Sequence, residues 1–252
     1  MQESISEIKS RFNTLKFEET PVFIKDYSDD ERAGVAALVK KAEKRMLEYE
    51  KEIARTDVML SFEKKYSDFE LICGIDEVGR GPLAGPVMAG AVILPKDDKI
   101  LYLNDSKKLS AGKRDELYEV IMDRALYVAI GESSCERIDE INILNATYEA
   151  MKKAISKLPV IPDILLNDAV TIPGVNIKQV PIIKGDAKSA SIAAASIVAK
   201  VTRDRYMEKM DEIYPGYGFS SNKGYGSADH IKALKELGPC PIHRKSFVKN
   251  FV

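Results

Sequence analysis

The chain has 252 residues, of which 45% are hydrophobic and 31% charged, and this composition excludes a disordered or collagen-like protein. Its 38 Lys and Arg residues nearly balance 39 Asp and Glu residues, which excludes a uniformly basic nucleic-acid-binding protein but leaves room for a local basic groove. Three widely spaced cysteines indicate neither a disulfide framework nor a zinc knuckle. The N-terminus lacks a signal-peptide pattern, and no segment reaches the ~18 apolar residues of a membrane span. We therefore expect a cytoplasmic protein without membrane contact.

Residues 1–70 have the pattern of a small helical extension. Apolar side chains recur every three or four residues after Ile5, which is the spacing of one helix face. Ser28 begins a capping-box sequence, so a second helix is expected to start there. The charge runs of this segment are more typical of a solvated helix face than of a binding site. We therefore distinguish an extension at 1–70 from a domain at 71–252.

The domain at 71–252 has the pattern of an α/β fold. Short apolar, β-branched runs bounded by Gly and Pro are typical of strands. Helices are expected at about 138–158 and 189–210, and the second is rich in small residues that allow close packing on a sheet. The segment from about 211 to 252 is expected to be helical. The expected strands are 71–76, 87–94, 125–133, 163–168 and 180–184.

Four carboxylates follow the ends of apolar runs, and they are Asp76, Glu77, Asp168 and Asp186. Burying several negative charges costs several kcal/mol unless something offsets them. Because ligands bind at the carboxyl ends of strands in α/β sheets, we expect the four to converge. Oxygen ligands suit Mg²⁺ or Mn²⁺, so the set predicts a site for two divalent ions. Taken singly, each acid also has a local interpretation: Asp168 as a turn residue and Asp186 as a helix cap.

The histidine content bears on the type of chemistry. The chain contains only His230 and His243, and neither lies near the runs that carry the acids. A histidine-based zinc site or a Ser-His-Asp triad is therefore poorly supported. Two-metal hydrolysis of a phosphodiester needs no histidine, because one ion lowers the pKa of the attacking water and the other stabilises the leaving oxygen.

The segment Gly79-Arg80-Gly81 follows the first acid pair and weakly matches a dinucleotide-binding loop. The residues after Pro86 read as another strand rather than as the helix such a loop requires, which argues against that interpretation. A glycine-rich hairpin without function is a simpler alternative. In favour of a functional loop, Arg80 lies next to the acids, and glycines let the backbone approach a ligand closely. Such a loop can contact a sugar-phosphate.

Polar, basic and aromatic residues near these motifs are candidate substrate contacts. Ser106, Lys107 and Lys108 share one loop, and Lys188 follows the last acid. From residue 200 to the end there are 10 Lys and Arg residues against 6 Asp and Glu residues, an excess that a solvated surface would also explain. Tyr225 lies in a glycine-rich stretch, where stacking on a sugar or base and ordinary packing are equally expected.

These motifs resemble ribonuclease HII, the type 2 ribonuclease H, over about residues 71–247. The resemblance implies an RNase H-like fold, with a mixed central sheet flanked by helices, and a metal-dependent endonuclease. Type 3 enzymes lack the Gly-Arg-Gly loop and are a weaker match. The motifs are GIDEVGRGPLAGPV (74–87), NDSKKLS (104–110), NILNATYEAM (142–151), LLND (165–168), KGDAKSASIAAASIVAKVTRDRYM (184–207), GYGF (216–219), NKGYGS (222–227) and PIHRKSF (241–247).

The resemblance also implies roles for individual residues. The metal-site acids of the family correspond to Asp76, Glu77, Asp168 and Asp186. The loop that contacts the ribonucleotide 2′-OH at an RNA–DNA junction corresponds to Gly79, Arg80 and Gly81, and the tyrosine that stacks on the following deoxyribose corresponds to Tyr225. Asn222 stands where a histidine is common, and residues 1–70 carry no motif with a transferable role.

The expected substrates are RNA–DNA hybrids and duplex DNA with single embedded ribonucleotides, as in ribonucleotide excision repair. Cleavage on the 5′ side of the ribonucleotide would leave 5′-phosphate and 3′-hydroxyl ends, with two Mg²⁺ or Mn²⁺ ions in the active complex. We expect the chain to act as a monomer. The alternative is a non-catalytic duplex-binding protein that uses the same basic surface and binds without metal.

Overall fold

The computed structural model describes residues 3–96 and 98–251. The chain forms two compact units, Met1–Asp57 and Val58–Val252, which divide earlier than the boundary expected near residue 70. Within the described part of the chain, no helix has both the length and the apolar character needed to cross a bilayer.

The first unit is helical. It contains α1 (Ile5–Thr14), the short 3₁₀ turn η1 (Phe17–Glu19), α2 (Thr20–Tyr27) and most of α3 (Ala33–Met59). The expected helix after Ile5 is confirmed: Ser4 and Glu7 form a capping box at its start, and Ile8 lies buried in the core. Phe23 and Val35 belong to the same core, so one apolar face of each helix packs inward.

The expected helix start at Ser28 is wrong. Ser28 is the residue that caps the C-terminal end of α2. Pro21 lies in the first turn of α2, where a backbone N–H has no partner within the helix, so the N–H that proline lacks costs no hydrogen bond. Helix α3 begins at Ala33, after Asp30 accepts a hydrogen bond from the Arg32 backbone N–H at 3.0 Å. The acid that shapes this helix start is therefore two residues beyond the expected serine.

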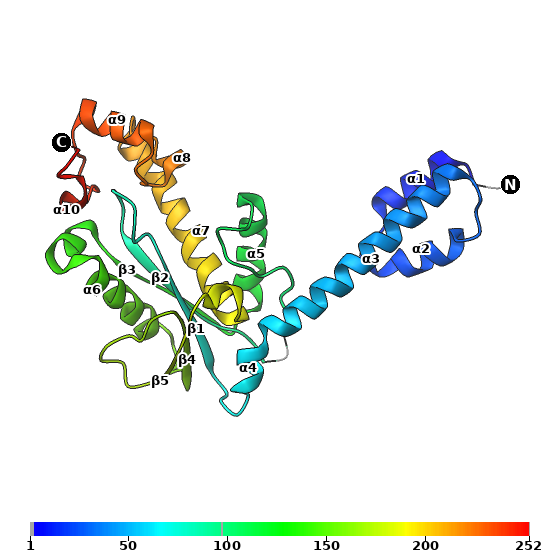
Figure 1. The fold of residues 1–252 in the computed structure, drawn as a ribbon, viewed down its shortest axis with the longest axis horizontal. Helices are drawn as coiled ribbons and strands as arrows, with labels where there is room; N and C mark the ends of the chain where they lie inside the picture. Colours follow the sequence, from blue (N-terminus) through cyan, green and yellow to red (C-terminus); the bar gives the residue numbers. More distant parts are fainter. Residues whose placement is uncertain (1–2, 97, 252) are drawn as a thin grey trace. The chain divides into compact units, whose positions relative to one another are not determined.

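The second unit is built on one five-stranded mixed sheet (Figure 1). The strand order is β3-β2-β1-β4-β5; β1, β2 and β3 are antiparallel neighbours, and β4 and β5 run parallel to β1. All five expected strands are confirmed to within about two residues at most ends, as apolar runs between Gly and Pro predict. Their bounds are β1 Ile72–Val78, β2 Val87–Ile93, β3 Tyr127–Ser133, β4 Ile164–Asp168 and β5 Lys178–Ile182.

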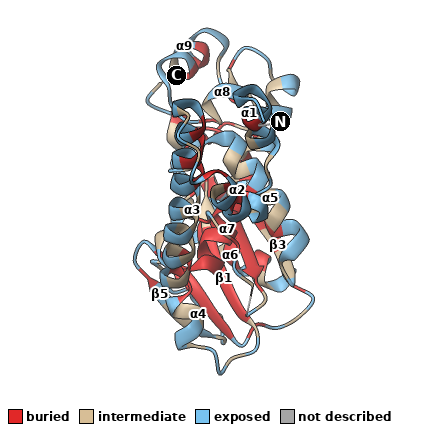
Figure 2. Cartoon of the chain, turned by 90° about the vertical axis from the view of Figure 1, so that its right-hand side faces the viewer, coloured by how far each residue is buried: buried red, intermediate tan, exposed pale blue. Residues whose placement is uncertain are grey.

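Helices cover both faces of this sheet. Helix α6 (Cys135–Ser156) packs on one face, and α7 (Ala190–Ile213) with α5 (Ala111–Arg124) packs on the other (Figure 1). Strands β1, β2 and β4 are largely buried, as is the sheet-facing side of α7 (Figure 2). A Cβ at Gly74 would lie 2.1 Å from the Ser191 carbonyl carbon, so glycine is required for α7 to approach β1 this closely.

Residues that the sequence analysis assigns to the extension form part of the second unit. Met59 and Leu60 lie in the core between β2, α5 and α7, and α4 (Ser61–Lys65) follows them. The C-terminal segment is helical as expected. It contains α8 (Phe219–Asn222), α9 (Ala228–Leu237) and α10 (Lys245–Val248), and the short 3₁₀ turn η2 (Gly185–Ala187) precedes α7.

Candidate active site

The acid pair lies within β1 rather than after it, because the strand continues to Val78. Asp76 pairs with Gly90 and Glu77 with Ala89 on β2. Successive strand residues point to opposite faces, so the two carboxylates leave the strand on different sides. Asp76 is buried against Ser196 of α7, and Glu77 lines an open cavity near α6.

The other two acids come from β4 and from the turn before α7. Asp168 is the last residue of β4, which runs parallel to β1, and its Oδ1 accepts a hydrogen bond from the Gly185 N–H at 2.7 Å. Asp186 is the next residue in this turn. The helix-cap interpretation of Asp186 is wrong, because the Ser189 side chain accepts the capping bond from the Ile192 N–H.

The electrostatics show that these acids repel one another. Burial raises the pKa of Asp76 well above its usual range, and the charge of Glu77 raises it further. Burial also raises the pKa values of Glu77 and Asp186. The negative charge of Asp168 contributes to the raised pKa of all three groups, so the four acids share one electrostatic environment.

The donor set fits hard divalent cations. Across residues 3–96 and 98–251, no three acidic, histidine or cysteine side chains are close enough to form a complete metal cage. The acids are instead close enough that the negative charge of one raises the pKa of another. A bound cation would offset this repulsion between the carboxylates. Carboxylate oxygens suit Mg²⁺ and Mn²⁺, and additional ligands can come from water and from the phosphate of a substrate.

Asp105 is a fifth acid at this site that the sequence analysis did not select. After burial, its charge is the largest cause of the raised pKa of Asp186. Its Oδ1 accepts a hydrogen bond from the Lys107 N–H at 2.9 Å, which closes a tight turn. The sequence signal was available in the motif NDSKKLS, where the analysis considered only the serine and the lysines.

Two fully buried arginines bind backbone carbonyls of the glycine loop 79–86 from the side of the protein interior. Arg203 donates hydrogen bonds to the carbonyls of Ala84 and Pro86 at 2.9 and 3.0 Å. Arg244 donates to the carbonyls of Gly79, Arg80 and Gly85 at 2.5–3.0 Å. Burial, followed by the charge of Arg203, lowers the pKa of Arg244 to about 10. Both arginines belong to the basic excess after residue 200, yet their charges lie beneath the loop rather than on a solvated surface.

An open cavity of about 900 Å³ brings the loop together with most of the expected substrate contacts. Lys108 and Lys188 are exposed and do not line it. Lys200, one of the basic residues counted from residue 200 onward, lines it. Ile143 and Phe247 line it although no sequence argument selected them for this role; Ile143 directly follows Asn142, whose positive φ of 65° kinks α6. The cavity is lined by Glu77, Val78, Gly79, Arg80, Gly81, Ser106, Lys107, Ile143, Lys200, Tyr225 and Phe247.

Tyr225 is 43% exposed and lies beside the loop. A Cβ built on Gly81 would lie 3.9 Å from Tyr225 Cε1, so the ring is next to the bare backbone of that glycine. Asn222 holds the turn that carries Tyr225, since its Nδ2 donates to the Tyr217 carbonyl and its Oδ1 accepts from the Gly224 N–H. The residue that departs from the family pattern therefore has a structural role here.

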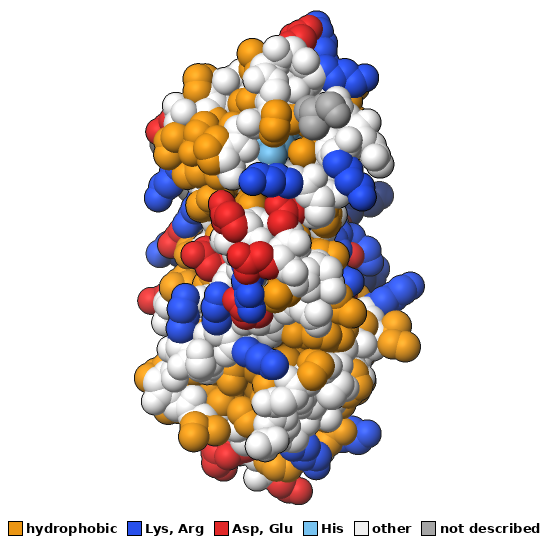
Figure 3. Space-filling view, turned by 90° about the vertical axis from the view of Figure 1, so that its left-hand side faces the viewer, with side chains coloured by type: hydrophobic (Ala, Val, Ile, Leu, Met, Phe, Trp, Pro, Cys, Tyr) orange, Lys and Arg blue, Asp and Glu red, His pale blue; other side chains and the backbone are white. Residues whose placement is uncertain are grey.

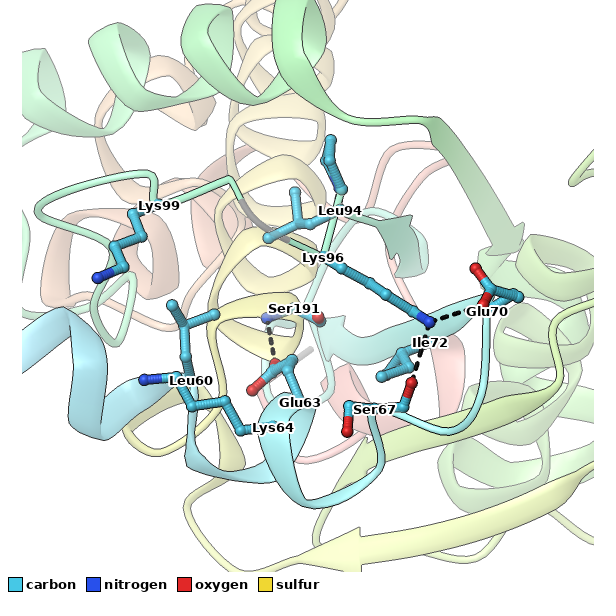
Figure 4. A pocket seen from close by; sticks show the side chains of 11 residues that line it. Leu60, Glu63, Lys64, Ser67, Glu70, Ile72, Leu94, Lys96, Lys99 and Ser191 are labelled. Atoms are coloured by element: carbon cyan, nitrogen blue, oxygen red, sulfur yellow. Dashed lines mark hydrogen bonds and ion pairs between the residues drawn. The ribbon is translucent and has the colours of Figure 1, made fainter.

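Glu63 ties α4 to the turn that carries Asp186. Its Oε1 accepts hydrogen bonds from Ser189 Oγ at 2.6 Å and from the Ser191 N–H at 2.9 Å, and Figure 4 shows it at the start of α7. A carboxylate at a helix N-terminus is favoured by the helix dipole. The sequence analysis missed this contact, because residue 63 was assigned to the extension and its partners lie 126–128 residues away.

Comparison with family models gives two matches. Residues 73–250 match the model described as Ribonuclease HII, and residues 4–67 match the model described as Ribonuclease HII N-terminal domain. The two matches together cover most of the chain.

Similar proteins are found among curated sequences and solved structures. The chain is 67% identical over 228 residues to ribonuclease HII of Lachnoclostridium phytofermentans, covering 90% of each chain. It is 53% identical over 251 residues to ribonuclease HII of Clostridioides difficile, covering 99% of this chain and 98% of the relative. The crystal structure of ribonuclease H2 from Pyrococcus horikoshii superposes with a TM-score of 0.60 at 28% identity, covering 72% of this chain and 96% of that one.

Proposed function

The chain belongs to the ribonuclease HII family and is a ribonuclease H endonuclease, and we propose that it cleaves RNA–DNA hybrids and duplex DNA containing single ribonucleotides. Cleavage on the 5′ side of the ribonucleotide would leave 5′-phosphate and 3′-hydroxyl ends. The observation that carries the proposal is a group of mutually repelling acids, one of which, Glu77, lines the same cavity as the glycine loop. The protein would act as a cytoplasmic monomer in the excision of ribonucleotides from DNA.

We assign the metal ligands to Asp76, Glu77, Asp168 and Asp186. The enzymes of this family depend on divalent metal ions, and we propose Mg²⁺ or Mn²⁺ for this chain. Two bound ions would lower the pKa of the attacking water and stabilise the leaving 3′-oxygen. The buried, mutually repelling carboxylates supply the negative charge that draws such ions to the scissile phosphate.

The glycine loop and its neighbours would orient the substrate. The carbonyls of Gly79, Arg80 and Gly85 bind Arg244, so they turn towards the protein interior. The opposite edge of the loop lines the cavity, and the bare backbone of Gly81 there would let a 2′-OH approach closely. Lys107 places a cation at the same cavity for a phosphate, and Tyr225 offers a ring to the neighbouring deoxyribose.

A cleavage assay on three duplexes tests the proposal. The full chain is incubated with all-DNA duplex, the same duplex containing one ribonucleotide, and a continuous RNA–DNA hybrid, while Mg²⁺ or Mn²⁺ is titrated against EDTA. We expect metal-dependent cleavage of the two ribonucleotide-containing duplexes only. The end chemistry is read from whether DNA ligase can rejoin the products, since ligation requires a 5′-phosphate and a 3′-hydroxyl.

Two variants sharpen the assay. Asp186→Asn should abolish cleavage because it removes a charged ligand oxygen. The matched control Asp115→Asn changes an acid that pairs with Arg205 outside the cavity, and it should cleave at the wild-type rate. Metal-independent duplex binding without cleavage would instead establish the non-catalytic alternative, and wild-type turnover by Asp186→Asn would reject the assignment of the metal ligands.

A further inference from the structure

The two histidines of the chain form a buried pair that the proposed mechanism does not use. Their Nε2 atoms are 3.0 Å apart, and His230 and His243 are 0% and 4% exposed. The rings of Tyr217 and Phe219 enclose them, with centroid distances of 4.9 Å from Tyr217 to His243 and 5.4 Å from Phe219 to His230. Figure 3 shows a small area of histidine surface between apolar and basic side chains. The pair is therefore held within a packed cluster.

The hydrogen bonds of the pair select one arrangement of protons. The Tyr225 carbonyl, 2.8 Å from His230 Nδ1, can only accept, so His230 Nδ1 carries the proton and its Nε2 is an acceptor. His243 Nε2 must then donate to His230 Nε2. In neutral His243 this leaves Nδ1 as an acceptor for the Cys240 N–H at 3.0 Å, which is nearer than the Cys240 carbonyl at 3.3 Å. Burial lowers the pKa of both imidazoles, which agrees with two neutral rings.

This directed chain of hydrogen bonds ends on the residue that faces the substrate. It runs from the Cys240 N–H through His243 and His230 to the Tyr225 carbonyl, and that carbonyl also accepts from the Ser227 N–H at 2.8 Å. On the other side of Tyr225, the Gly224 carbonyl accepts from the Leu83 N–H at 2.8 Å, which ties the segment to the glycine loop. The backbone on both sides of the ring is thus fixed relative to the cavity.

We propose that His230 and His243 are positioning residues that hold Tyr225 beside Gly81 through this one tautomeric arrangement, and thereby set the preference for an RNA–DNA junction. The inference rests on the proposed function, because it assumes that the Tyr225 ring contacts the deoxyribose. It adds a role for two residues outside the cavity. If His243 could not donate, His230 Nε2 would be left as a buried acceptor without a donor, and the cost of this unmade bond would destabilise the arrangement that holds the Tyr225 carbonyl.

The proton arrangement is tested on the wild-type protein without any substrate. Long-range ¹H–¹⁵N correlation spectra of the full chain at pH 7.5 distinguish an imidazole protonated on Nδ1 from one protonated on Nε2. We expect Nδ1–H for His230 and Nε2–H for His243. The opposite tautomer at either residue would overturn the inference, whatever the cleavage data show.

Two substitutions at one position test the effect on selectivity. In His243→Gln the side-chain amide can still donate from the ε position to His230, whereas in His243→Asn the shorter amide matches only the Nδ1 position. We expect His243→Asn to lower kcat/KM for a single embedded ribonucleotide by about tenfold, the consequence of one unmade buried hydrogen bond, and to affect a continuous hybrid less. His243→Gln should restore most of the preference.

Tyr217→Phe is the matched control for loosening of the cluster. It removes the hydrogen bond that Tyr217 Oη donates to the Gly238 carbonyl at 2.7 Å and leaves the histidine pair intact. It should lower the melting temperature without changing the ratio of kcat/KM for the two substrates. An equal loss on both substrates in His243→Asn, or the same ratio change in Tyr217→Phe, would overturn the positioning role.

Tyr225→Ala separates this inference from the proposed function. If Tyr225→Ala changes the substrate ratio and His243→Asn does not, the histidine link is rejected and the role of Tyr225 stands. If Tyr225→Ala leaves the ratio unchanged, the proposed contact of Tyr225 and the inference fall together. Absence of cleavage by the wild-type protein in Mg²⁺ and Mn²⁺ would reject the proposed function itself, and the tautomer spectra would still decide the proton arrangement.

Discussion

At the scale of residues, buried charges of both signs flank the loop 79–86. The carboxylate of Asp76 lies on β1 just before the loop, and the guanidinium groups of Arg203 and Arg244 lie beneath it. The arginines are solvated by backbone carbonyls, which satisfy their donors without neutralising their charge. A phosphate approaching the loop would therefore meet fixed positive charge from below, and metal ions would meet fixed negative charge from β1. In the proposed mechanism, the two sets of charges would act on different parts of one phosphodiester.

Asp76→Asn should abolish cleavage and raise the stability of the metal-free protein. Burial raises the pKa of Asp76 in the folded chain above its value in the unfolded chain. Such a group favours folding below its unfolded pKa, and this contribution is lost as pH rises through the folded pKa. In EDTA at pH 8 we expect the variant to be more stable than wild type by roughly 1–3 kcal/mol, with the difference decreasing towards pH 4. Thermal unfolding at both pH values measures it.

The metal response of the same variant provides an independent check. Mn²⁺ should raise the melting temperature of the wild-type protein, because a ligand that binds only the folded state stabilises it. The rise should be smaller in Asp76→Asn, since one ligand oxygen has lost its charge. Equal stabilisation of both proteins by Mn²⁺ would show that Asp76 does not bind the ion, and lower stability of the variant in EDTA would contradict the account of its pKa.

At the scale of elements, α7 organises the site along its length. Its first turn follows Asp186 and is capped by Ser189 and Glu63, its middle faces Asp76 through Ser196, and Arg203 lies one to two turns further on. These contacts need a helix that lies very close to the sheet. The run of Ala and Ser in α7, opposite glycines in β1 and β2, provides that approach.

Two truncations test where the catalytic unit begins. Removal of residues 1–57 should leave a folded, active nuclease, because the sheet, α4 and all the acids are retained. Removal of residues 1–65 also deletes Met59 and Leu60 from the core and Glu63 from the start of α7. We expect this longer truncation to lower the melting temperature strongly, since each large buried apolar side chain that is lost costs about 2–5 kcal/mol.

Circular dichroism, thermal unfolding and cleavage of a single embedded ribonucleotide are measured on both truncations. Glu63→Gln in the full chain is the control that removes only the charge at the helix start, and Glu70→Gln changes an exposed acid that pairs with Lys96 near α4. Similar stability of the two truncations would show that residues 58–65 belong functionally with the extension, as the sequence boundary near residue 70 implies.

The elements show how far sequence reasoning extends in this chain. Strands were predicted well because a buried strand is a short apolar run. The prediction of a helix start at Ser28 failed because α2 extends to Tyr27, so Ser28 caps the end of that helix instead of starting a new one. Local pattern therefore fixes the type of an element better than its ends.

The site divides in the same way. The acids and the glycine loop could be selected because they stand at the ends of apolar runs and in specific motifs. Glu63, Arg203 and Arg244 could not be assigned their roles, because each acts on a segment more than 100 residues away. The histidine pair was dismissed for lying far from the acids in sequence, although its hydrogen bonds reach Tyr225. Such contacts exist only once the chain has folded.

At the scale of the whole molecule, charge is distributed without a strongly basic unit. Residues 1–57 contain 11 Lys and Arg against 13 Asp and Glu, and residues 58–252 contain 27 against 26. Neither unit can bind duplex by net charge alone. The acids Asp76, Glu77, Asp168 and Asp186, of which Glu77 lines the cavity, further oppose the approach of phosphates until cations neutralise them. Productive binding of duplex should therefore be coupled to binding of divalent ions.

Binding of an all-DNA duplex, which is not a substrate for cleavage, tests this coupling. In EDTA the wild-type protein should bind weakly, and Ca²⁺ or Mg²⁺ should strengthen binding by neutralising the cavity acids. The double variant Asp76→Asn with Asp186→Asn should bind more tightly than wild type in EDTA, because two negative charges are removed where the phosphates must lie. The control variant Asp115→Asn with Glu119→Gln removes two acids that pair with Arg205 on another surface. Fluorescence anisotropy at several salt concentrations gives the affinity and its salt dependence. Each phosphate contact contributes about −0.9 to the slope of log K against log salt concentration, and we expect a shallow slope because few phosphates are contacted. If both double variants strengthen binding equally in EDTA, net charge rather than the cavity acids controls duplex affinity, and the proposed coupling to divalent ions is wrong.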